Sequence, residues 1–300
     1  MHFGGEAIYL TIQRLLTALA HGASVVGKST LLAMTEYFKS MNEHSLKKTL
    51  SKLNIDGLRY FDSIGSTNDE ALAWAAAGAP DLSIVIADEQ TNGRGRLDRK
   101  WFTPKGSGLA FSLVLRPTAT LRPHLSRTVG LAALSIAKSC SGLGLSARIK
   151  WPNDILLNGK KAAGILIETV WSGDDVDSLV IGMGINVHKE SVPPAELLQF
   201  PATSLEDELE KEAPSRGEIL FSVLNAFVRW RELMATDELI HAWEEMLAFR
   251  GRQVQVQTGG DSSIIGELLG LESDGSLRLR DANDKSVIIR FGDVSLRPGA

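Results

Sequence analysis

Residues 147–168 read ARIKWPNDILLNGKKAAGILIE, and the expected architecture can be developed from them. Two short segments, 147–151 and 154–157, are expected to be β-strands. The dipeptide Asn158-Gly159 follows, and it predicts a type I′ hairpin turn because both residues tolerate a positive φ. The chain then returns through an apolar run at 162–168. We therefore expect antiparallel strands at the centre of the chain.

Strands and helices alternate on both sides of this hairpin. A helix is expected from Thr67 to Gly78, because Thr67-Asn68-Asp69-Glu70 has the form of a capping box with Thr67 as the cap. The expected fold class is α+β, with a mixed β-sheet flanked by helices. The other expected strands are 58–62, 82–87, 108–115 and 178–187, and the other expected helices are 124–139, 215–234 and 236–248.

The pattern changes after Phe249, where short alternating strands replace helices. Turns such as Ser273-Asp274-Gly275 separate these strands, which predicts a small antiparallel barrel of about 50 residues. We therefore expect three parts: a helical extension at 1–48, a central domain at 49–248 and a barrel at 249–300. The expected barrel strands are 253–257, 264–271, 277–280 and 287–290.

The extension at 1–48 shows helical stretches and no expected strand. Met34 and Met41 are alternative starting residues, so we expect a peripheral or disordered segment that could precede the true start. Residues 22–29, GASVVGKS, match the phosphate-binding loop G-x-x-x-x-G-K-[ST] at every position. A buried strand should precede such a loop, whereas the apolar residues of 8–19 follow helical spacing. We interpret the match as a glycine-rich turn between helices.

Composition limits the classes of protein to consider. The chain has 300 residues, 44% of them apolar and 23% charged, which is ordinary for a globular protein. No apolar run reaches the roughly 18 residues that a membrane span needs, and the start lacks a basic secretory region. Cys140 is the single cysteine, so no internal disulfide can form. These features predict a cytoplasmic protein, and the net charge of −4 argues against broad nucleic-acid binding.

A basic loop is expected at Gln90–Trp101, which reads QTNGRGRLDRKW. From Arg94 to Lys100 it carries three arginines, one lysine and one aspartate, a local charge of +3 in an acidic protein. The interspersed glycines let the backbone approach a ligand, and guanidinium groups grip phosphate or carboxylate oxygens. A binding loop for a polyanion is one interpretation, and a solvated surface loop is the other.

Two further motifs can carry chemistry. The first motif is Lys150–Asp154. Lys150 lies at the end of an expected strand, where it could bind a carboxylate or phosphate as a fixed positive charge. Asn153 and Asp154 could alternatively cap the following turn. In Ile181–Val187 two glycines alternate inside an apolar strand, which leaves one sheet face open either to a ligand or to packing.

Five motifs together resemble those of the biotin protein ligases. They occur in the family's order and span about residues 55–300, and those enzymes also end in a small SH3-like barrel. The resemblance implies a biotin/lipoate ligase-like fold of the class II synthetase type. The motifs are Ser66-Thr67-Asn68, Gln90 with Gly93-Arg94-Gly95-Arg96, Lys150–Asp154, Gly164-Ile165-Leu166 and Gly182–Asn186.

The resemblance implies an ATP-dependent ligase that works in two steps. Such an enzyme forms biotinyl-5′-AMP from biotin and ATP, and then transfers biotin to a lysine of a biotin carboxyl carrier protein, such as that of acetyl-CoA carboxylase. Mg²⁺ would arrive with ATP rather than occupy a fixed protein site. A homodimer is a conceivable assembly, and neither a membrane nor DNA is expected as a partner.

The resemblance also implies roles for individual residues. Lys150 would bridge the biotin carboxyl group and the α-phosphate of ATP. The implied catalytic residues are Lys150, Arg94 and Arg96. The implied biotin-binding residues are Ser66, Thr67, Asn68, Gln90, Gly93, Arg94, Gly95, Arg96, Lys150, Gly164 and Leu166. The implied ATP-binding residues are Arg96, Arg99, Trp101, Lys150, Asn153 and Asn186.

One departure from the family and two alternatives remain. Leu97-Asp98 stands where many relatives continue with Arg-Gly, which weakens the charge of the loop. Lipoate or octanoate ligases share the fold and the reaction class, but they favour an Arg-Gly-Gly signature that this sequence lacks. A biotin-responsive DNA-binding repressor would need a winged helix–turn–helix, and residues 1–48 are short for one and show no basic recognition helix.

Overall fold

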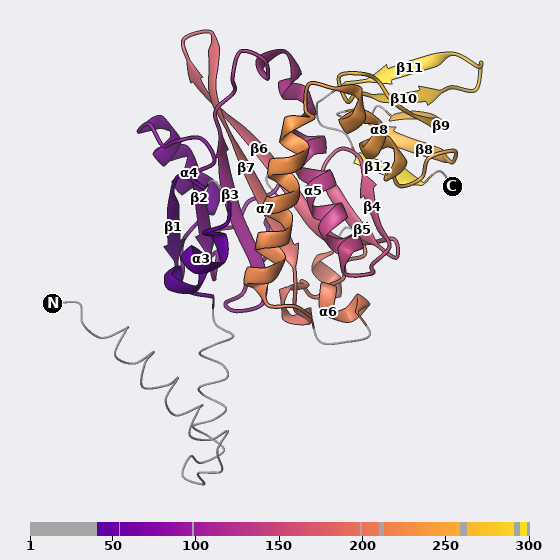
Figure 1. Ribbon diagram of the computed structural model, residues 1–300. Coiled ribbons are helices and arrows are strands. Elements are labelled where there is room, and N and C mark those ends of the chain that lie inside the picture. The colour runs from indigo at the N-terminus through magenta and orange to yellow at the C-terminus, as the bar shows by residue number, and fades with distance from the viewer. Residues whose placement is uncertain are drawn as a thin grey trace, which may run out of the picture. The chain divides into compact units, whose positions relative to one another are not determined.

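The computed structural model describes most of the chain after residue 40 (Figure 1). The expectations for residues 1–40, including the loop at 22–29, lie outside the described residues, as does that for Asp98. The last part of the expected extension forms helix α3 (Glu43–Leu50), which begins with a capping box between Asn42 and Ser45. The described ranges are 41–53, 55–97, 99–198, 200–209, 213–258, 263–290 and 295–298.

A mixed sheet of seven described strands forms the centre of the fold, in the order β1-β2-β3-β7-β6-β5-β4. Strands β1 and β2 are parallel, and all the other neighbours are antiparallel. This arrangement confirms the predicted α+β class. The strands are β1 (Leu58–Phe61), β2 (Ile84–Ala87), β3 (Gly108–Leu115), β4 (Ala147–Lys150), β5 (Asp154–Leu157), β6 (Lys160–Ser172) and β7 (Asp175–Asn186).

The two faces of the sheet pack against different helices, because successive residues of a strand point to opposite faces. On β2, Ile84 and Ile86 join the large core cluster shared with α5 (Thr128–Gly142) and α7 (Arg216–Glu232). Val85 joins a smaller cluster under α4 (Thr67–Ala76) on the other face. Helix α8 (Asp237–Glu245) packs on α5, and a short helix, α6 (Leu205–Glu208), follows β7.

The hairpin of β6 and β7 is longer than predicted. Its turn contains Gly173 at a φ of 60°, and its outer end projects from the sheet in Figure 1. The sequence there mixes polar residues with half-buried Val170 and Val176 and exposed Trp171, so it lacks the continuous apolar pattern from which strands were predicted. The predicted turn at Asn158-Gly159 is confirmed, with φ values of 47° and 78°.

Two predicted helix starts were wrong. Thr67 is the first residue of α4 rather than its cap, and the N-cap is Ser66, whose hydroxyl makes no capping bond to the described first turn. The helix expected from His124 begins as a 3-10 turn at Arg122–Arg127, with proline in its first turn, before α5 starts at Thr128.

The C-terminal residues form the predicted antiparallel barrel, a sheet in the order β11-β10-β9-β8-β12. Helix α8 ends at Glu245 and β8 begins at Gln253, so the chain passes from the last helix to the barrel strands between these residues. The barrel strands are β8 (Gln253–Gln257), β9 (Ser263–Leu271), β10 (Leu277–Arg280), β11 (Ser286–Ile289) and β12 (Ser295–Pro298).

Candidate active site

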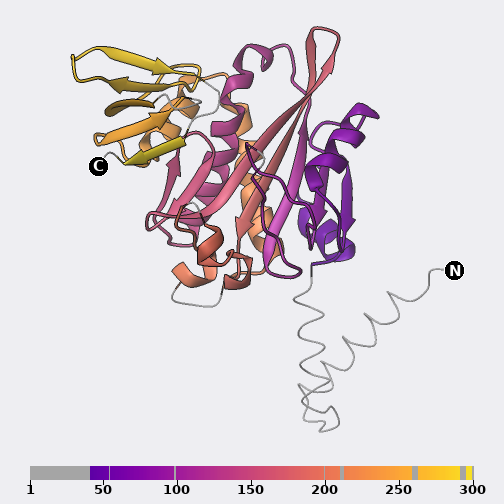
Figure 2. The same cartoon turned by 180° about the vertical axis from the view of Figure 1, so that it is seen from behind.

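A cavity of about 500 Å³ lies on the face of the sheet that carries α4. Residues of β6 and β7 form its floor. The segment between β2 and β3 crosses this face of the sheet in Figure 2. The structure therefore gathers motifs that are far apart in the sequence. The predicted site residues that line the cavity are Ser66, Thr67, Asn68, Gln90, Arg94, Gly95, Arg96, Arg99, Trp101, Lys150, Asn153, Gly164, Leu166 and Asn186.

One end of the cavity is polar but uncharged. Thr67 donates its backbone N–H to Gln90 Oε1 at 2.8 Å, and its hydroxyl lies 3.0 Å from the same oxygen. Gln90 Nε2 in turn donates to the hydroxyl of Thr103 at 3.4 Å. Because α4 begins here, Ser66 and Thr67 stand at a helix N-terminus with their side chains toward the cavity. Such a pocket suits a neutral ligand that both donates and accepts hydrogen bonds.

A buried serine, which no sequence motif indicated, supports this end of the cavity. Ser112 on β3 is fully buried, and its hydroxyl contacts Asn68 Oδ1 and, at 2.8 Å, Thr67 Oγ1. Asn68 also donates from Nδ2 to Glu168 Oε2 at 2.8 Å. These bonds fix which way the Asn68 amide points, since a carboxylate can only accept.

The alternating glycines of β7 make room for protein side chains. A Cβ atom at Gly182 would lie 2.1 Å from Asn68 Oδ1, and one at Gly184 would lie 2.3 Å from the Trp101 ring. Gly164 lies opposite Gly184 on β6, and its Cβ would lie 3.1 Å from the same ring. The glycines therefore seat Asn68 and Trp101 as cavity walls, rather than leaving the sheet face bare for a ligand.

The basic loop folds back on itself. Gly95 N–H donates to Arg99 O at 2.6 Å, and Trp101 N–H donates to Gly93 O at 2.9 Å. A Cβ atom at Gly93 would lie 2.4 Å from Trp101 O, so only glycine allows this close pairing. Gly93 itself lies behind the cavity wall, outside the described lining residues. Its contribution is to the shape of the loop.

Arg94 is bound by two carboxylates. Its Nη1 and Nη2 atoms contact Glu168 at 2.9 and 2.7 Å, and Nη2 also contacts Asp69 Oδ1 at 2.7 Å. The hydrogen bond to Glu168, with the two negative charges, raises the pKa of Arg94 above its ordinary value. The charge that we expected to face a ligand is thus largely compensated within the protein. We therefore interpret Arg94 as a structural residue that holds the loop against β6 and α4.

Beside Arg94, the loop cations Arg96, Arg99 and Lys100 also line the cavity. Arg96 Nη1 lies 3.5 Å from Asn153 Oδ1, and Asn153 is itself anchored because its Nδ2 donates to Ile165 O at 2.8 Å. Asn186 ends β7, is buried, and donates from Nδ2 to Thr203 O at 3.0 Å. An amide has two N–H groups and one carbonyl, so the Asn186 side chain keeps hydrogen-bonding capacity for a ligand.

Lys150 lies at the end of β4 with its side chain 11% exposed. Its Nζ atom lies 3.5 Å from Asp154 Oδ2 and 4.6 Å from the centre of the Phe200 ring. Burial lowers the pKa of Lys150, and the nearby cations Lys161 and Arg99 lower it further, while Asp154 acts in the opposite direction. Asp154 and Phe200 therefore hold the Lys150 ammonium group in place, largely shielded from solvent.

Lys161 is a cavity cation that our sequence analysis missed. Its Nζ atom lies 2.6 Å from Asp154 Oδ1 and 5.5 Å from the centre of the Trp101 ring, and its side chain is 27% exposed. Asp154 thus holds a lysine on each carboxylate oxygen. The sequence shows Lys160-Lys161 as a pair, and only the hairpin register, which shifts between Ile155 and Leu156, decides that Lys161 faces the cavity.

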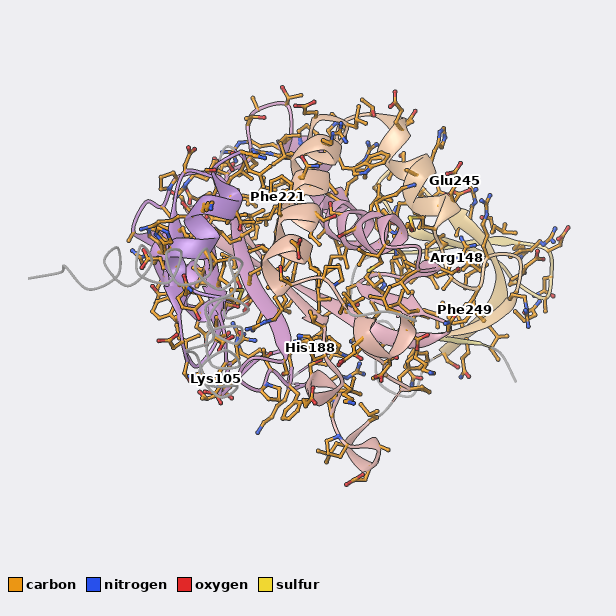
Figure 3. All side chains as sticks on the ribbon, turned by 60° about the horizontal axis from the view of Figure 1, so that its bottom comes forward. Lys105, Arg148, His188, Phe221, Glu245 and Phe249 are labelled. Carbon is orange, nitrogen blue, oxygen red and sulfur yellow. The ribbon has the colours of Figure 1, made fainter. Side chains whose placement is uncertain are left out.

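The segment after β7 closes the remaining side of the cavity. It begins where His188 N–H donates to Ser107 O at 2.9 Å, near the turn that carries Lys105 (Figure 3). Two 3-10 turns follow, at Lys189–Ser191 and Ala195–Leu197. No helical or strand period runs through this segment, so its structure could not be predicted from the sequence. Its lining residues are Ser191, Pro193, Leu197, Leu198, Phe200 and Ala202.

The barrel supports the floor of the cavity. Trp151 is buried beside Lys150, and its Nε1 donates to Gly275 O at 2.9 Å in the turn between β9 and β10. Arg127 Nε donates to Ser273 O of the same turn at 2.7 Å. The barrel turn is therefore part of the packing that holds Trp151, and with it the end of β4.

A mixed sheet carrying a cavity with a neutral polar end and a cationic end, followed by a small barrel, defines the class of biotin and lipoate protein ligases. In agreement, residues 60–186 match the Biotin/lipoate A/B protein ligase family, and residues 249–297 match the Biotin protein ligase C terminal domain. The second match favours biotin ligases over the lipoate alternative.

Individual relatives narrow the class further. A biotin--[acetyl-CoA-carboxylase] ligase of Paracoccus denitrificans is 36% identical over 74% of this chain and 94% of its own length. The bifunctional ligase/repressor BirA of Bacillus spizizenii is 36% identical over 74% of this chain and 69% of its length. The biotin protein ligase of Aquifex aeolicus, solved with biotin and ATP, superposes with a TM-score of 0.70 at 28% identity, covering 81% of this chain and 99% of that one. The chain belongs to the biotin protein ligase family.

Proposed function

We propose that this protein joins biotin to a carrier lysine in two ATP-dependent steps. The biotin carboxylate first attacks the α-phosphorus of ATP, which gives biotinyl-5′-AMP and pyrophosphate. The carrier amine then attacks the biotinyl carbonyl carbon, and AMP leaves. The observation that carries this proposal is the meeting of cations from two separate segments, the loop at 94–99 and the strands at 150–161, around one cavity.

The uncharged end of the cavity suits the ureido ring of biotin, which offers two N–H donors and one carbonyl acceptor. Ser66, Thr67 and Gln90 supply hydroxyl and amide groups there. The aliphatic tail of biotin then runs past Gly164 and Leu166 toward the cations. A Cβ atom at Gly164 would lie 3.2 Å from Lys161 Nζ, so this path ends next to an ammonium group.

The cationic end brings two anions together, and its positive charges offset the repulsion between them, which is stronger in a protein cavity than in bulk water. We assign the biotin carboxylate to Lys161 and the α-phosphate to Lys150, with Arg96 and Arg99 around the outer phosphates. Mg²⁺ enters with ATP and supplies further charge compensation. Preorganised charges of this kind stabilise the transition state because they need no reorganisation during the reaction. Asn186 and the segment at 188–202 are our candidates for holding the adenosine.

The test is a protein-labelling reaction with the purified chain. Biotin, Mg²⁺-ATP and a biotin carboxyl carrier domain should give a carrier whose mass increases by one biotinyl group at one lysine. Lipoate and octanoate in place of biotin should give little product. Labelling by lipoate as fast as by biotin would contradict the proposed substrate.

Replacing Arg96 by glycine should release the intermediate. A hydrogen bond to a charged group typically contributes about 1.5–3 kcal/mol, so Arg96→Gly should speed dissociation of biotinyl-5′-AMP by roughly 10- to 100-fold. The freed intermediate would biotinylate bystander proteins, which mass spectrometry of an added non-carrier protein can quantify. Strict carrier specificity in this variant would argue against the role given to Arg96.

The lowered pKa of Lys150 predicts an alkaline limit to the first step. The step requires the ammonium form, which is present below the folded-state pKa and is lost as pH rises through it. Lys150→Arg keeps the charge at all accessible pH values, so its alkaline limb should move to higher pH. Rates of biotinyl-5′-AMP formation without carrier, measured against pH, check this shift. If the alkaline limbs of the two pH profiles were identical, the group that titrates would be a residue other than Lys150.

We further propose that the acceptor is the carrier protein of acetyl-CoA carboxylase or a related carboxylase, and that the enzyme works in the cytoplasm. Within the described part of the chain, no helix is long and apolar enough to cross a bilayer.

Light scattering during size-exclusion chromatography, with and without biotin and ATP, would distinguish a monomer from the homodimer considered above.

A further inference from the structure

Glu168 on β6 joins two walls of the cavity from outside it. Its carboxylate accepts hydrogen bonds from both terminal nitrogens of Arg94, at 2.9 and 2.7 Å, and from Asn68 Nδ2 at 2.8 Å. Its side chain is 25% exposed and lies outside the set of described residues that line the cavity. One carboxylate therefore holds the basic loop and the first turn of α4 together.

Both partners of Glu168 face the cavity. Arg94 belongs to the folded-back loop that presents Gly95 and Arg96. From Asn68, hydrogen bonds continue through the hydroxyl of Ser112 to Thr67, where we place the biotin ring. A continuous network thus runs from the neutral end of the cavity to the loop at its cationic end.

The second carboxylate on Arg94 is placed differently. The Asp69 side chain is 56% exposed and makes one contact with Arg94, at 2.7 Å. Exposed ion pairs contribute little because water and salt screen them. Glu168, by contrast, grips the guanidinium through two parallel bonds, which fixes its orientation as well as its position.

We propose that Glu168 is a positioning residue that locks the basic loop onto the head-group pocket and so retains biotinyl-5′-AMP until the carrier arrives. This inference rests on the proposed function. Glu168 acts through Arg94 and Asn68, and it takes no direct part in the chemistry. When its bonds are lost, the contacts of the loop with the sheet still include Trp101 against Gly164 and Gly184, and the contact between Arg96 and Asn153.

Three variants test the proposal on the full chain. Glu168→Ala removes all three bonds, Glu168→Gln keeps an acceptor but loses the charge, and Asp69→Asn is the control for the exposed pair. Single-turnover reactions without carrier measure formation of biotinyl-5′-AMP, and a filter assay measures its release. Labelling of an added non-carrier protein reports the escaped intermediate, and thermal unfolding reports stability.

We expect release to accelerate roughly 10- to 100-fold in Glu168→Ala, less in Glu168→Gln, and within about twofold of the unmodified protein in Asp69→Asn. A purely structural role would lower the unfolding temperature without raising the ratio of release to transfer. If Glu168→Ala fails to fold, Glu168→Gln carries the test alone.

Two results would overturn the inference while leaving the ligase intact. The first is release at the unmodified rate in the Glu168 variants, and the second is equal release from Asp69→Asn and Glu168→Ala. Failure of the unmodified protein to form biotinyl-5′-AMP at all would instead remove the proposed function, and the inference with it.

Discussion

Lys161→Met is expected to slow formation of biotinyl-5′-AMP by about 10²- to 10³-fold, the usual cost of removing one preorganised charge from a transition state. Lys161 Nζ is held by Asp154 at 2.6 Å and lies next to Gly164, where the biotin carboxylate is placed. Methionine keeps most of the unbranched stem of the side chain and removes its terminal ammonium group. Since the affected charge faces biotin, the Michaelis constant for biotin should also rise.

The neighbouring lysine provides a matched control. Lys160 has a half-exposed side chain that pairs with Glu208 at 3.3 Å, outside the set of described cavity residues. Lys160→Met should therefore form the intermediate within about twofold of the unmodified rate, as expected for an exposed pair. If both variants retained the unmodified rate, or if Lys160→Met were the slower, the placement of the carboxylate would be wrong.

Lys150→Met should have a second effect of similar size, about 10²- to 10³-fold on the same step. Its Nζ atom lies over the Phe200 ring, and Lys150 and Arg99 line the same cavity, so we place Lys150 against the α-phosphate. The loss should be seen mainly in the rate constant at saturating ATP, because the charge on that phosphate develops during the reaction. Stopped-flow detection of pyrophosphate release measures this rate directly.

An exposed lysine of α5, Lys138, is the control for this variant. Lys138→Met should leave both the rate and the fold unchanged. Circular dichroism should show that Lys150→Met is folded, since its methionine fills the space of the lysine stem beside Phe200. Near-normal pyrophosphate release from folded Lys150→Met would contradict the assignment of the α-phosphate.

Much of the fold could be predicted because its signals are local. The strands at 84–87, 108–115 and 154–157 are short apolar runs, and the Asn158-Gly159 turn follows from backbone conformation alone. The helix cap was predicted wrongly because Thr67 has a tertiary partner. Its backbone N–H and hydroxyl contact Gln90, 23 residues away, and a local motif cannot reveal this competition.

The site was predictable as a set of motifs, and less so as a set of roles. Arg94 looked like a ligand cation because the carboxylate that binds it, Glu168, is 74 residues distant. For Gly182 the sequence left a ligand and packing as alternatives, because Asn68, which fills the space, approaches from another element. Lys161 was missed because one residue of register separates it from its exposed neighbour Lys160. All of these depend on contacts between separate strands and helices.

The most direct test of the central claim is isotope exchange between labelled pyrophosphate and ATP, measured without any carrier protein. If the cations of the loop and of the β4–β6 strands act on one biotin carboxylate and one α-phosphate, exchange should require biotin and Mg²⁺ together. It should fall by about 10²- to 10³-fold in Lys161→Met. Exchange that is absent with the folded protein and biotin, or equally fast without biotin, would contradict the account.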